Sequence, residues 1–283
     1  MAAQFIGAHM KTSGGMGNAL RNGKAIGCTA VQVFTSSPQM WKASAVTPEK
    51  VADFKKAQQE TGITEVITHD SYLINLCADD PAMREKSIEG LTNELLRSYL
   101  YGIKYVVSHI GAHRGSGFEA VAESAADGML RVLDNTPDDV MLLMETTAGQ
   151  GSSLNSRFEE LAKLLELTKG HPRLGVCIDT CHIFVAGYDI RTEAAFKKTF
   201  DEYNRLVGFD RLKAIHCNDS KKGLGSKVDR HENIGKGEIG PKAFELLVND
   251  KRFDRVPITL ETEAEMHEEN IKVLRGYQKP AKK

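Results

Sequence analysis

Eight short runs of apolar and β-branched residues recur along the 283-residue chain, and longer amphipathic stretches lie between most of them. This alternation is typical of repeated βα units, which place their strands side by side in a parallel sheet. Eight parallel strands can close on themselves and so remove both sheet edges, which predicts an α/β fold of the (β/α)₈ TIM-barrel type. The predicted strands are Phe5–His9, Ala30–Thr35, Glu65–His69, Tyr105–His109, Val140–Glu145, Gly175–Asp179, Lys213–Asn218 and Val256–Glu261.

Thr47 and Pro48 predict the start of the first clear helix, because Thr suits an N-cap and Pro the first helical position. The predicted helices include Pro48–Glu60, Met83–Tyr99, Phe118–Leu133, Arg157–Leu167, Glu193–Val207 and Pro241–Val248. A doubly wound open sheet is the alternative fold, but no GxGxxG motif follows the first strand. A barrel commonly occupies about 250 residues and no low-complexity linker divides the chain, so we expect one domain over residues 1–283.

Composition limits the classes of partner and compartment. The formal net charge of −1 gives no overall attraction to nucleic acid, so DNA binding would need a local basic patch. No apolar run approaches the roughly 20 residues of a membrane span, and the N-terminus does not resemble a signal peptide. The five cysteines include no CxxC pair, which favours reduced thiols. We therefore expect an intracellular protein without membrane contact, cytoplasmic if it is bacterial.

Ionisable residues end most of the predicted strands. In a TIM barrel the carboxyl ends of the strands meet at one rim, where the active site lies. Several such groups in one pocket would repel or desolvate one another without a cation, so the pattern predicts a metal site. Imidazole and carboxylate together favour zinc, with manganese or iron possible. The strand-end residues are His9, His69, His109, Glu145, Asp179, His216 and Glu261.

Three further candidate ligands are expected in loops: His182 just beyond Asp179, and the pair Asp229 and His231. In an extended segment, side chains two residues apart point the same way, as two ligands of one ion require. Taken alone, however, Asp229 to His231 has the composition of an ordinary solvated loop. Neighbouring Cys177 and Cys181 are expected to be small buried packing residues.

Long motifs surround these positions and run in order from the first predicted strand to the last. They are GAHMKTSGG (7–15), HDSYLINL (69–76), ETTAGQGSSL (145–154), GVCIDTCHIFVAGYD (175–189), HCNDSKKGLGSKVDRHENIGKGEIG (216–240) and LET (260–262). These motifs strongly resemble the endonuclease IV family of zinc-dependent apurinic/apyrimidinic (AP) endonucleases, and they are far more specific than a short pattern.

The resemblance implies a xylose-isomerase-like barrel with three zinc ions. The first ion would be held by His69, His109 and the bridging Glu145; the second by Glu145, Asp179, His216 and Glu261; the third by His182, Asp229 and His231. Glu145, Asp179 and Glu261 would be the catalytic carboxylates. The implied reaction cuts DNA 5′ to an abasic site, leaving a 3′-hydroxyl and a 5′-deoxyribose phosphate, and removes 3′ blocking groups. Zinc would supply hydroxide at neutral pH and neutralise the departing oxygen.

The resemblance also implies DNA contacts. Tyr72 and Leu73 match wedge positions that support a bent duplex, although without the family they would be expected in the core. Gln39 stands where the family commonly has Arg, and Ile110 where it has Pro. The chain therefore departs from the family pattern in the loops expected to contact DNA. His9 is expected to contact a ligand or a substrate phosphate. Basic residues expected at the rim are Lys11, Lys42, Arg114, Lys221, Lys222, Lys227 and Arg230, of which Lys227 and Arg230 are candidate DNA contacts.

Two other functions remain open at this point. A sugar isomerase or epimerase of the xylose-isomerase type shares the barrel, but it has no use for the His182, Asp229 and His231 set. A damage-binding protein with purely structural metals is the second, although three protein ligands and an open position favour catalysis. His113, His171 and His267 are expected at the surface, and a monomer is expected from the family.

Overall fold

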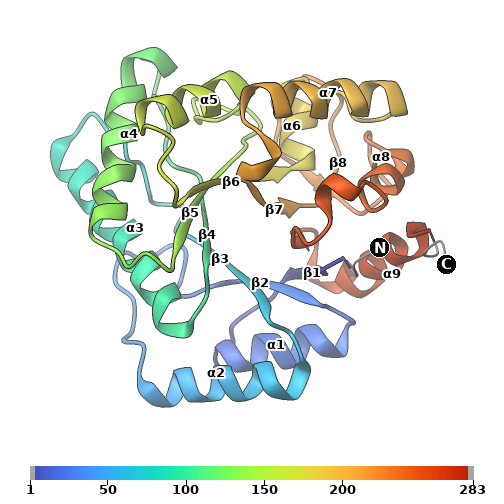
Figure 1. Ribbon diagram of the computed structural model, residues 1–283, viewed down its shortest axis with the longest axis horizontal. Helices are drawn as coiled ribbons and strands as arrows, with labels where there is room; N and C mark the ends of the chain where they lie inside the picture. Colours follow the sequence, from blue (N-terminus) through green and yellow to red (C-terminus); the bar gives the residue numbers. More distant parts are fainter. Residues whose placement is uncertain (1–3, 280–283) are drawn as a thin grey trace.

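The computed structural model describes residues 4–279, and its centre is a closed barrel of eight parallel strands (Figure 1). Their order around the barrel is β1-β10-β7-β6-β5-β4-β3-β2. The barrel closes where Gly7 of β1 pairs with Ala30 of β2 on one side and Thr259 of β10 on the other. The strands are β1 (Ile6–His9), β2 (Ala30–Phe34), β3 (Glu65–His69), β4 (Tyr105–Ser108), β5 (Met141–Glu145), β6 (Leu174–Asp179), β7 (Leu212–His216) and β10 (Ile258–Leu260).

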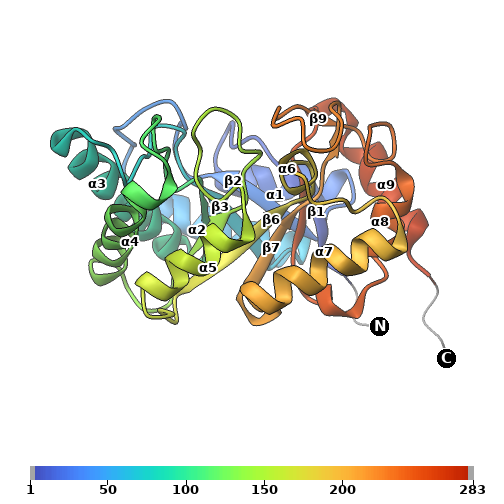
Figure 2. The same ribbon diagram turned by 90° about the horizontal axis from the view of Figure 1, so that it is seen from above.

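Helices surround the barrel, and the long loops that follow the strands rise on one side of this ring (Figure 2). Two short strands, β8 (Asp219–Ser220) and β9 (His231–Glu232), form an antiparallel pair within the loop after β7. The helices are α1 (Met16–Ala25), α2 (Pro48–Thr61), α3 (Pro81–Tyr101), α4 (Phe118–Asp134), α5 (Phe158–Leu167), α6 (Thr180–Ala186), α7 (Glu193–Leu206), α8 (Pro241–Leu247) and α9 (His267–Tyr277), with 3₁₀ turns at Phe209–Arg211, Lys251–Phe253 and Ala264–Met266.

The predicted barrel is confirmed, and every predicted strand boundary lies within two residues of the observed one. Thr47 caps α2 as expected, since its hydroxyl accepts from the Lys50 N–H. Helices α1, α6 and α9 were not predicted. Gly15 precedes α1 without a side-chain cap, so the usual start signal is missing there. The cap of α6 is Asp179, the last residue of a strand, and the helix has only seven residues, too few to show an amphipathic period.

A small apolar cluster fills the barrel interior below the strand ends. Its members include Ile67, Val107, Leu143, Cys177 and Ala214, one from each of five consecutive strands. Alternate residues of a strand point to the same side, so the residue two positions later also faces inward. Those positions are occupied by His69, His109, Glu145, Asp179 and His216. The strand period therefore places five of the predicted ligands on top of the apolar interior.

The large remaining core lies between the barrel and its helices, and it includes Phe54 of α2, Phe158 of α5 and Phe200 of α7. All five cysteines are buried and free, in agreement with the expectation of reduced thiols. Within residues 4–279, no helix is both long and apolar enough to cross a membrane.

Candidate metal centre

The nine predicted ligands converge at the carboxyl ends of the barrel strands. The possible ligand atoms within each predicted set lie within 4.8 Å of one another. Six of the nine ligands line a cavity of about 410 Å³, which His9, Lys11 and Tyr72 also line, whereas Glu145, Asp179 and His216 lie buried beneath it. The three sets that the structure brings together are His69, His109 and Glu145; Glu145, Asp179, His216 and Glu261; and His182, Asp229 and His231.

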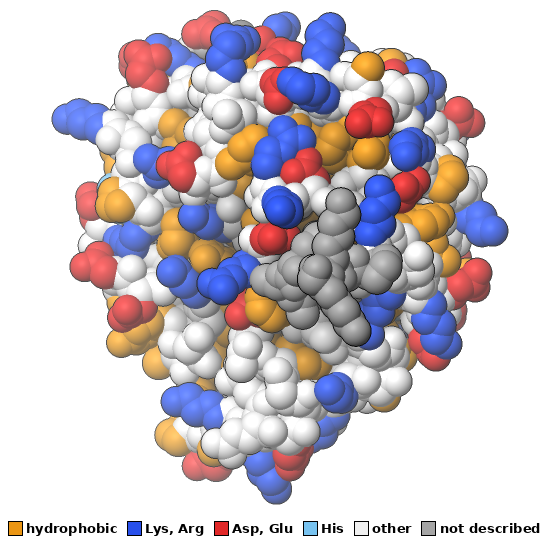
Figure 3. Space-filling model, turned by 45° about the vertical axis from the view of Figure 1, so that its right-hand side comes forward, with side chains coloured by type: hydrophobic (Ala, Val, Ile, Leu, Met, Phe, Trp, Pro, Cys, Tyr) orange, Lys and Arg blue, Asp and Glu red, His pale blue; other side chains and the backbone are white. Residues whose placement is uncertain are grey.

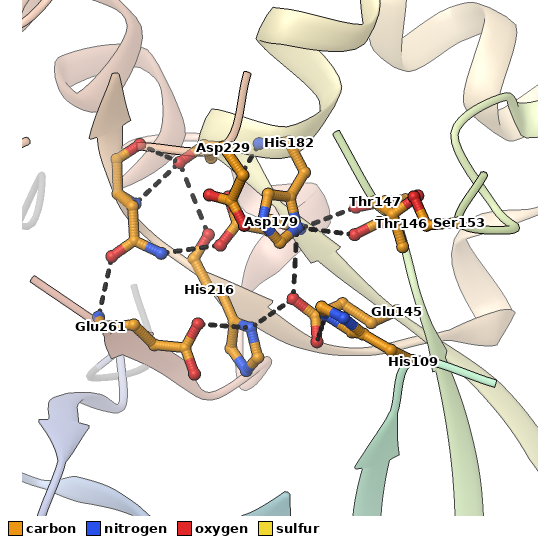
Figure 4. A network of polar contacts seen from close by, with 12 residues as sticks. His109, Glu145, Thr146, Thr147, Ser153, Asp179, His182, His216, Asp229 and Glu261 are labelled. Carbon is orange, nitrogen blue, oxygen red and sulfur yellow. Dashed lines mark hydrogen bonds and ion pairs between the residues drawn. The ribbon is translucent and has the colours of Figure 1, made fainter. Parts of the chain in front are cut away.

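Glu145 stands between the first two sets (Figure 4). It is fully buried, and its Oε2 lies 3.0 Å from His69 Nε2 and 2.9 Å from His109 Nε2. Its other oxygen, Oε1, lies 2.9 Å from His216 Nδ1. The two oxygens of one carboxylate therefore face histidines of two different sets, which is the geometry that a bridging ligand needs.

The third set is built by the junction of β6 and α6, which supplies His182, together with Asp229 of the loop between β8 and β9 and His231 at the start of β9. Asp179 ends β6 and caps α6, because its Oδ1 accepts from the His182 N–H at 2.9 Å. This cap fixes the turn that directs His182 toward the site. His182 Nε2 lies 3.1 Å from Asp229 Oδ2, and His231 Nε2 lies 3.3 Å from Asp229 Oδ1. Both ring nitrogens are buried without a hydrogen-bond partner among the described residues, so two imidazoles and a carboxylate face one space suited to a cation.

Four histidines are oriented by a bond to the ring nitrogen that faces away from the centre. The acceptors in these bonds are carbonyl oxygens, so the bonded nitrogen carries the proton and the other nitrogen is left to bind a metal. These bonds join His69 Nδ1 to Asp70 O at 3.1 Å, His182 Nδ1 to Thr146 O at 2.8 Å, His216 Nε2 to Gln32 Oε1 at 2.6 Å, and His231 Nδ1 to Glu261 O at 3.3 Å.

Cys181 also lies near Asp179 and His231. Burial raises the pKa of its thiol to about 12, so it stays protonated near neutral pH. The packing role expected for Cys181 therefore agrees with its burial.

Without a metal, the carboxylates of the centre hold protons on the histidines. Burial opposes the charge of His69, but its contacts with Asp70 and Glu145 outweigh this and raise the pKa of His69 well above its usual value. The pKa values of His182 and His216 are raised against burial by neighbouring acidic groups. Burial likewise opposes the charge of Glu145, yet the adjacent His109 and His216 hold its pKa well below the usual range.

These shifts predict a pH-dependent stability of the metal-free protein. A histidine with a raised pKa in the fold stabilises it fully below the unfolded value of about 6.5, and this contribution is lost as pH rises through the folded pKa. We therefore expect the urea midpoint of chelated protein to fall as pH rises above about 6.5. Zinc-loaded protein should keep its midpoint over this range because the metal replaces those protons. If the urea midpoints of the chelated and the zinc-loaded protein fell equally with rising pH, this interpretation of the centre would be contradicted.

Two buried amides that sequence reasoning missed connect the candidate ligands. Gln32 of β2 donates to Glu261 Oε1 at 2.5 Å while its Oε1 accepts from His216. Asn218 donates to Asp179 Oδ2 at 2.7 Å and accepts the Glu261 N–H at 2.8 Å. The available signal for Gln32 was a polar residue inside an otherwise apolar strand, and for Asn218 its place two residues after His216.

The two remaining histidines of the cavity differ in how well they were predicted. His9 Nδ1 lies 3.0 Å from Gln32 Nε2 and 3.4 Å from Glu261 Oε1, so it contacts a candidate ligand, which is one of the two roles expected for it. His267 was expected at the surface, and this was wrong. It is buried beside the cavity and its Nε2 donates to Thr262 O at 3.0 Å, because the unpredicted helix α9 begins there.

The candidate DNA contacts lie around this centre in separate loops. The Tyr72 side chain is 66% exposed beside the cavity, which contradicts the core position expected for it without the family. Gln39 is exposed and Leu73 is partly buried in neighbouring turns. Lys227 and Arg230 are exposed, but neither lines the cavity: Lys227 borders a separate hollow of about 310 Å³. Ile110 is buried and its carbonyl accepts the Leu76 N–H, so it packs locally.

Charge elsewhere is mixed. On the face drawn in Figure 3, basic and acidic side chains are interspersed without a broad area of one sign. This agrees with the net charge of −1. Of the basic residues expected at the rim, Lys11 lines the cavity itself.

Comparison with known proteins first gives the class. A family model described as a xylose isomerase-like TIM barrel matches residues 20–277, and the fold and site together define a barrel with a clustered candidate metal centre. A protein named "Probable endonuclease 4" from Chloroflexus aurantiacus is 49% identical over 258 residues, covering 91% of this chain and 90% of that protein. The solved endonuclease IV from Thermus thermophilus is 34% identical, with a TM-score of 0.86 and coverage of 96% and 98%. The chain belongs to the endonuclease IV family of AP endonucleases, as its motifs predicted.

The barrel is also shared more widely. A solved D-tagatose 3-epimerase-like protein has a TM-score of 0.75 over 97% of each chain, but only 14% sequence identity. At that identity the likeness shows the fold alone, because one barrel supports many chemistries.

Proposed function

We propose that the chain is a zinc-dependent phosphodiesterase that cuts duplex DNA 5′ to an abasic site and removes 3′ blocking groups. The observation that carries this proposal is the orientation of the centre's histidines, four of which turn a free ring nitrogen toward the carboxylates of the centre. Imidazole with carboxylate is the donor set that zinc prefers, with manganese or iron as alternatives. The three ligand sets would together hold three ions per chain.

The centre suits hydrolysis of an anionic diester, because bound zinc supplies hydroxide near neutral pH and neutralises charge on the attacking and leaving oxygens. The protein's part is to hold the donor groups rigidly. Glu145 would fix the separation of the first two sites from its buried position, with Asp179 and Glu261 completing the second. Gln32 and Asn218 orient these carboxylates through hydrogen bonds, so the site is preorganised before substrate arrives.

Selectivity for abasic DNA would come from the cavity and its exposed rim. A nucleotide that lacks its base costs less to turn out of the duplex than a stacked, paired one. Tyr72 stands exposed beside the cavity, where an aromatic wedge would support the bent duplex. Lys11 at the cavity, with Gln39, Leu73, Lys227 and Arg230 in the surrounding loops, would contact the DNA strands. All nine candidate ligands come from one chain, so a monomer would suffice.

Incubation with a duplex that contains one tetrahydrofuran site tests this proposal. We expect a single break immediately 5′ to the lesion in zinc-loaded protein, and an intact strand when the same duplex has a normal nucleotide there. The product should carry a 3′-hydroxyl that a DNA polymerase extends. Binding without cleavage would instead indicate a damage-binding protein. If a ketose sugar were epimerised and the duplex left intact, the epimerase alternative would replace the nuclease.

A further inference from the structure

The loop between β2 and α2 is tied at both ends to one residue of α3. This segment, residues 35–46, is called the Trp41 loop here because it carries the only tryptophan of the chain. The Arg97 guanidinium donates to Thr35 Oγ1 at 2.9 Å and to Thr35 O at 2.5 Å. Its third contact reaches Ser44 O, also at 2.5 Å. A single planar donor group therefore joins the beginning of the loop to its end.

A buried carboxylate completes this anchor. Glu94, one turn before Arg97 on α3, is 6% exposed and accepts from the hydroxyls of Thr35 and Ser36, each at 2.5 Å. The Thr35 hydroxyl thus donates to Glu94 while it accepts from Arg97. Burying a carboxylate is costly unless its oxygens are hydrogen-bonded, and here the loop supplies the hydroxyl donors. Disturbing Glu94 should consequently release the start of the loop.

The Trp41 loop is also bonded to the segment that carries Tyr72. The Pro38 carbonyl accepts from Ser71 Oγ at 2.7 Å and from the Tyr72 N–H at 3.1 Å. Phe34, which ends β2 directly before the loop, packs against the Tyr72 ring with centroids 5.7 Å apart. The turns that expose Gln39 and Tyr72 are therefore parts of one hydrogen-bonded unit.

Trp41 rests on α3 over a glycine. A Cβ added at Gly90 would come within 3.3 Å of the Trp41 ring, so the small residue leaves room for it. Lys86 is on the same helix as Gly90, and its Nζ lies 4.6 Å from the centre of the Trp41 ring. Trp41 is partly buried against the core, which makes it a reporter of how the loop sits on α3.

We propose that Glu94 and Arg97 are positioning residues for DNA binding, which hold the Trp41 loop and, through Pro38, the Tyr72 turn in one preformed arrangement. Neither residue lines the catalytic cavity or belongs to the three ligand sets, so they act through the loops. A preformed binding surface gains affinity because fewer side chains must be ordered when the partner arrives. This inference rests on the proposed function, since it assumes that the loops meet the abasic duplex.

The test compares Glu94→Gln with the wild type on the tetrahydrofuran duplex. Ordering a few loop side chains opposes binding, so we expect KM to rise about tenfold or more while kcat changes less than about twofold. Zinc content should be unchanged. The Trp41 emission should shift to longer wavelength and acrylamide should quench it more readily, because the loop leaves α3. Glu123→Gln, the same change at an exposed position of α4 away from this loop, is the matched control and should behave as wild type.

Ser36→Ala provides a milder variant in case Glu94→Gln does not fold. It removes one of the two hydroxyls that Glu94 accepts from, and it should raise KM severalfold with the same change in Trp41 emission. The inference is overturned if the wild type cuts the duplex and these variants match it in KM and emission, or if kcat and zinc content fall while KM rises. A wild type that does not cut the duplex would instead overturn the proposed function.

Discussion

Glu145→Gln should abolish cleavage of the tetrahydrofuran duplex and leave the fold intact. The carboxylate is fully buried and contacts His69, His109 and His216 with its two oxygens. Gln has nearly the same shape, but it has one weak acceptor and a donor NH₂ that cannot bind a cation. If the bridge holds two ions, its loss removes several kcal/mol of transition-state stabilisation, which corresponds to a decrease in kcat of about 10³-fold or more.

Glu123→Gln serves as the control for this variant, because Glu123 is exposed on α4. Circular dichroism and gel filtration should show both variants folded like the wild type, and zinc analysis should show ions missing only in Glu145→Gln. If Glu145→Gln cut the duplex at the wild-type rate, Glu145 would not be the bridging ligand. A decrease in activity without any loss of zinc would assign Glu145 a role in proton transfer instead.

The purified protein should contain about three zinc ions per chain, since each of the three ligand sets offers three or four donors and zinc in proteins usually has four. Dialysis against a strong chelator should remove the ions and stop cleavage, and added zinc should restore it. The metal-free protein should also unfold more easily: ligands present at about 1,000 times their dissociation constant stabilise a fold by roughly 4 kcal/mol per site. Elemental analysis and urea unfolding measure both effects.

Asp229→Ser separates the third set from the others. Asp229 belongs to the third set alone, where it faces His182 and His231. The first two sets, in contrast, share Glu145. The variant should therefore retain about two ions per chain, by the same ligand count. A wild-type protein with one ion or none would refute the trinuclear centre. A wild-type value near two, unchanged in Asp229→Ser, would limit the centre to the pair bridged by Glu145.

The strand-end pattern was informative because strand geometry is local. Side chains alternate along a strand, and parallel strands end at the same rim, so residues as distant as His69 and Glu261 were predicted to meet without knowledge of any contact. The loop residues Asp229 and His231 were different: spacing alone did not separate them from a solvated loop, and the family motif placed them. The comparisons confirmed the barrel and the family.

Contacts between residues far apart in the sequence were not predictable in the same way. Gln32 meets His216 across 184 positions. His267 was expected at the surface, and helix α9, which buries it, begins without a side-chain cap that would have indicated its start. The role of Glu94 in holding the Trp41 loop gave no signal either, since a charged residue on an amphipathic helix is ordinarily solvated.

The sequence by itself determined the barrel, the family and the set of residues predicted to meet at its rim. Strand alternation and long motifs both depend on residues that are close together in the sequence. Only the tertiary structure decided which nitrogen of each histidine faces the centre and which helix holds the loops beside it. Those features depend on single hydrogen bonds, such as His182 Nδ1 to Thr146 O and Arg97 to Ser44 O, whose partners lie 36 and 53 positions apart. A bond of this kind forms only after packing has brought its two groups within about 3 Å.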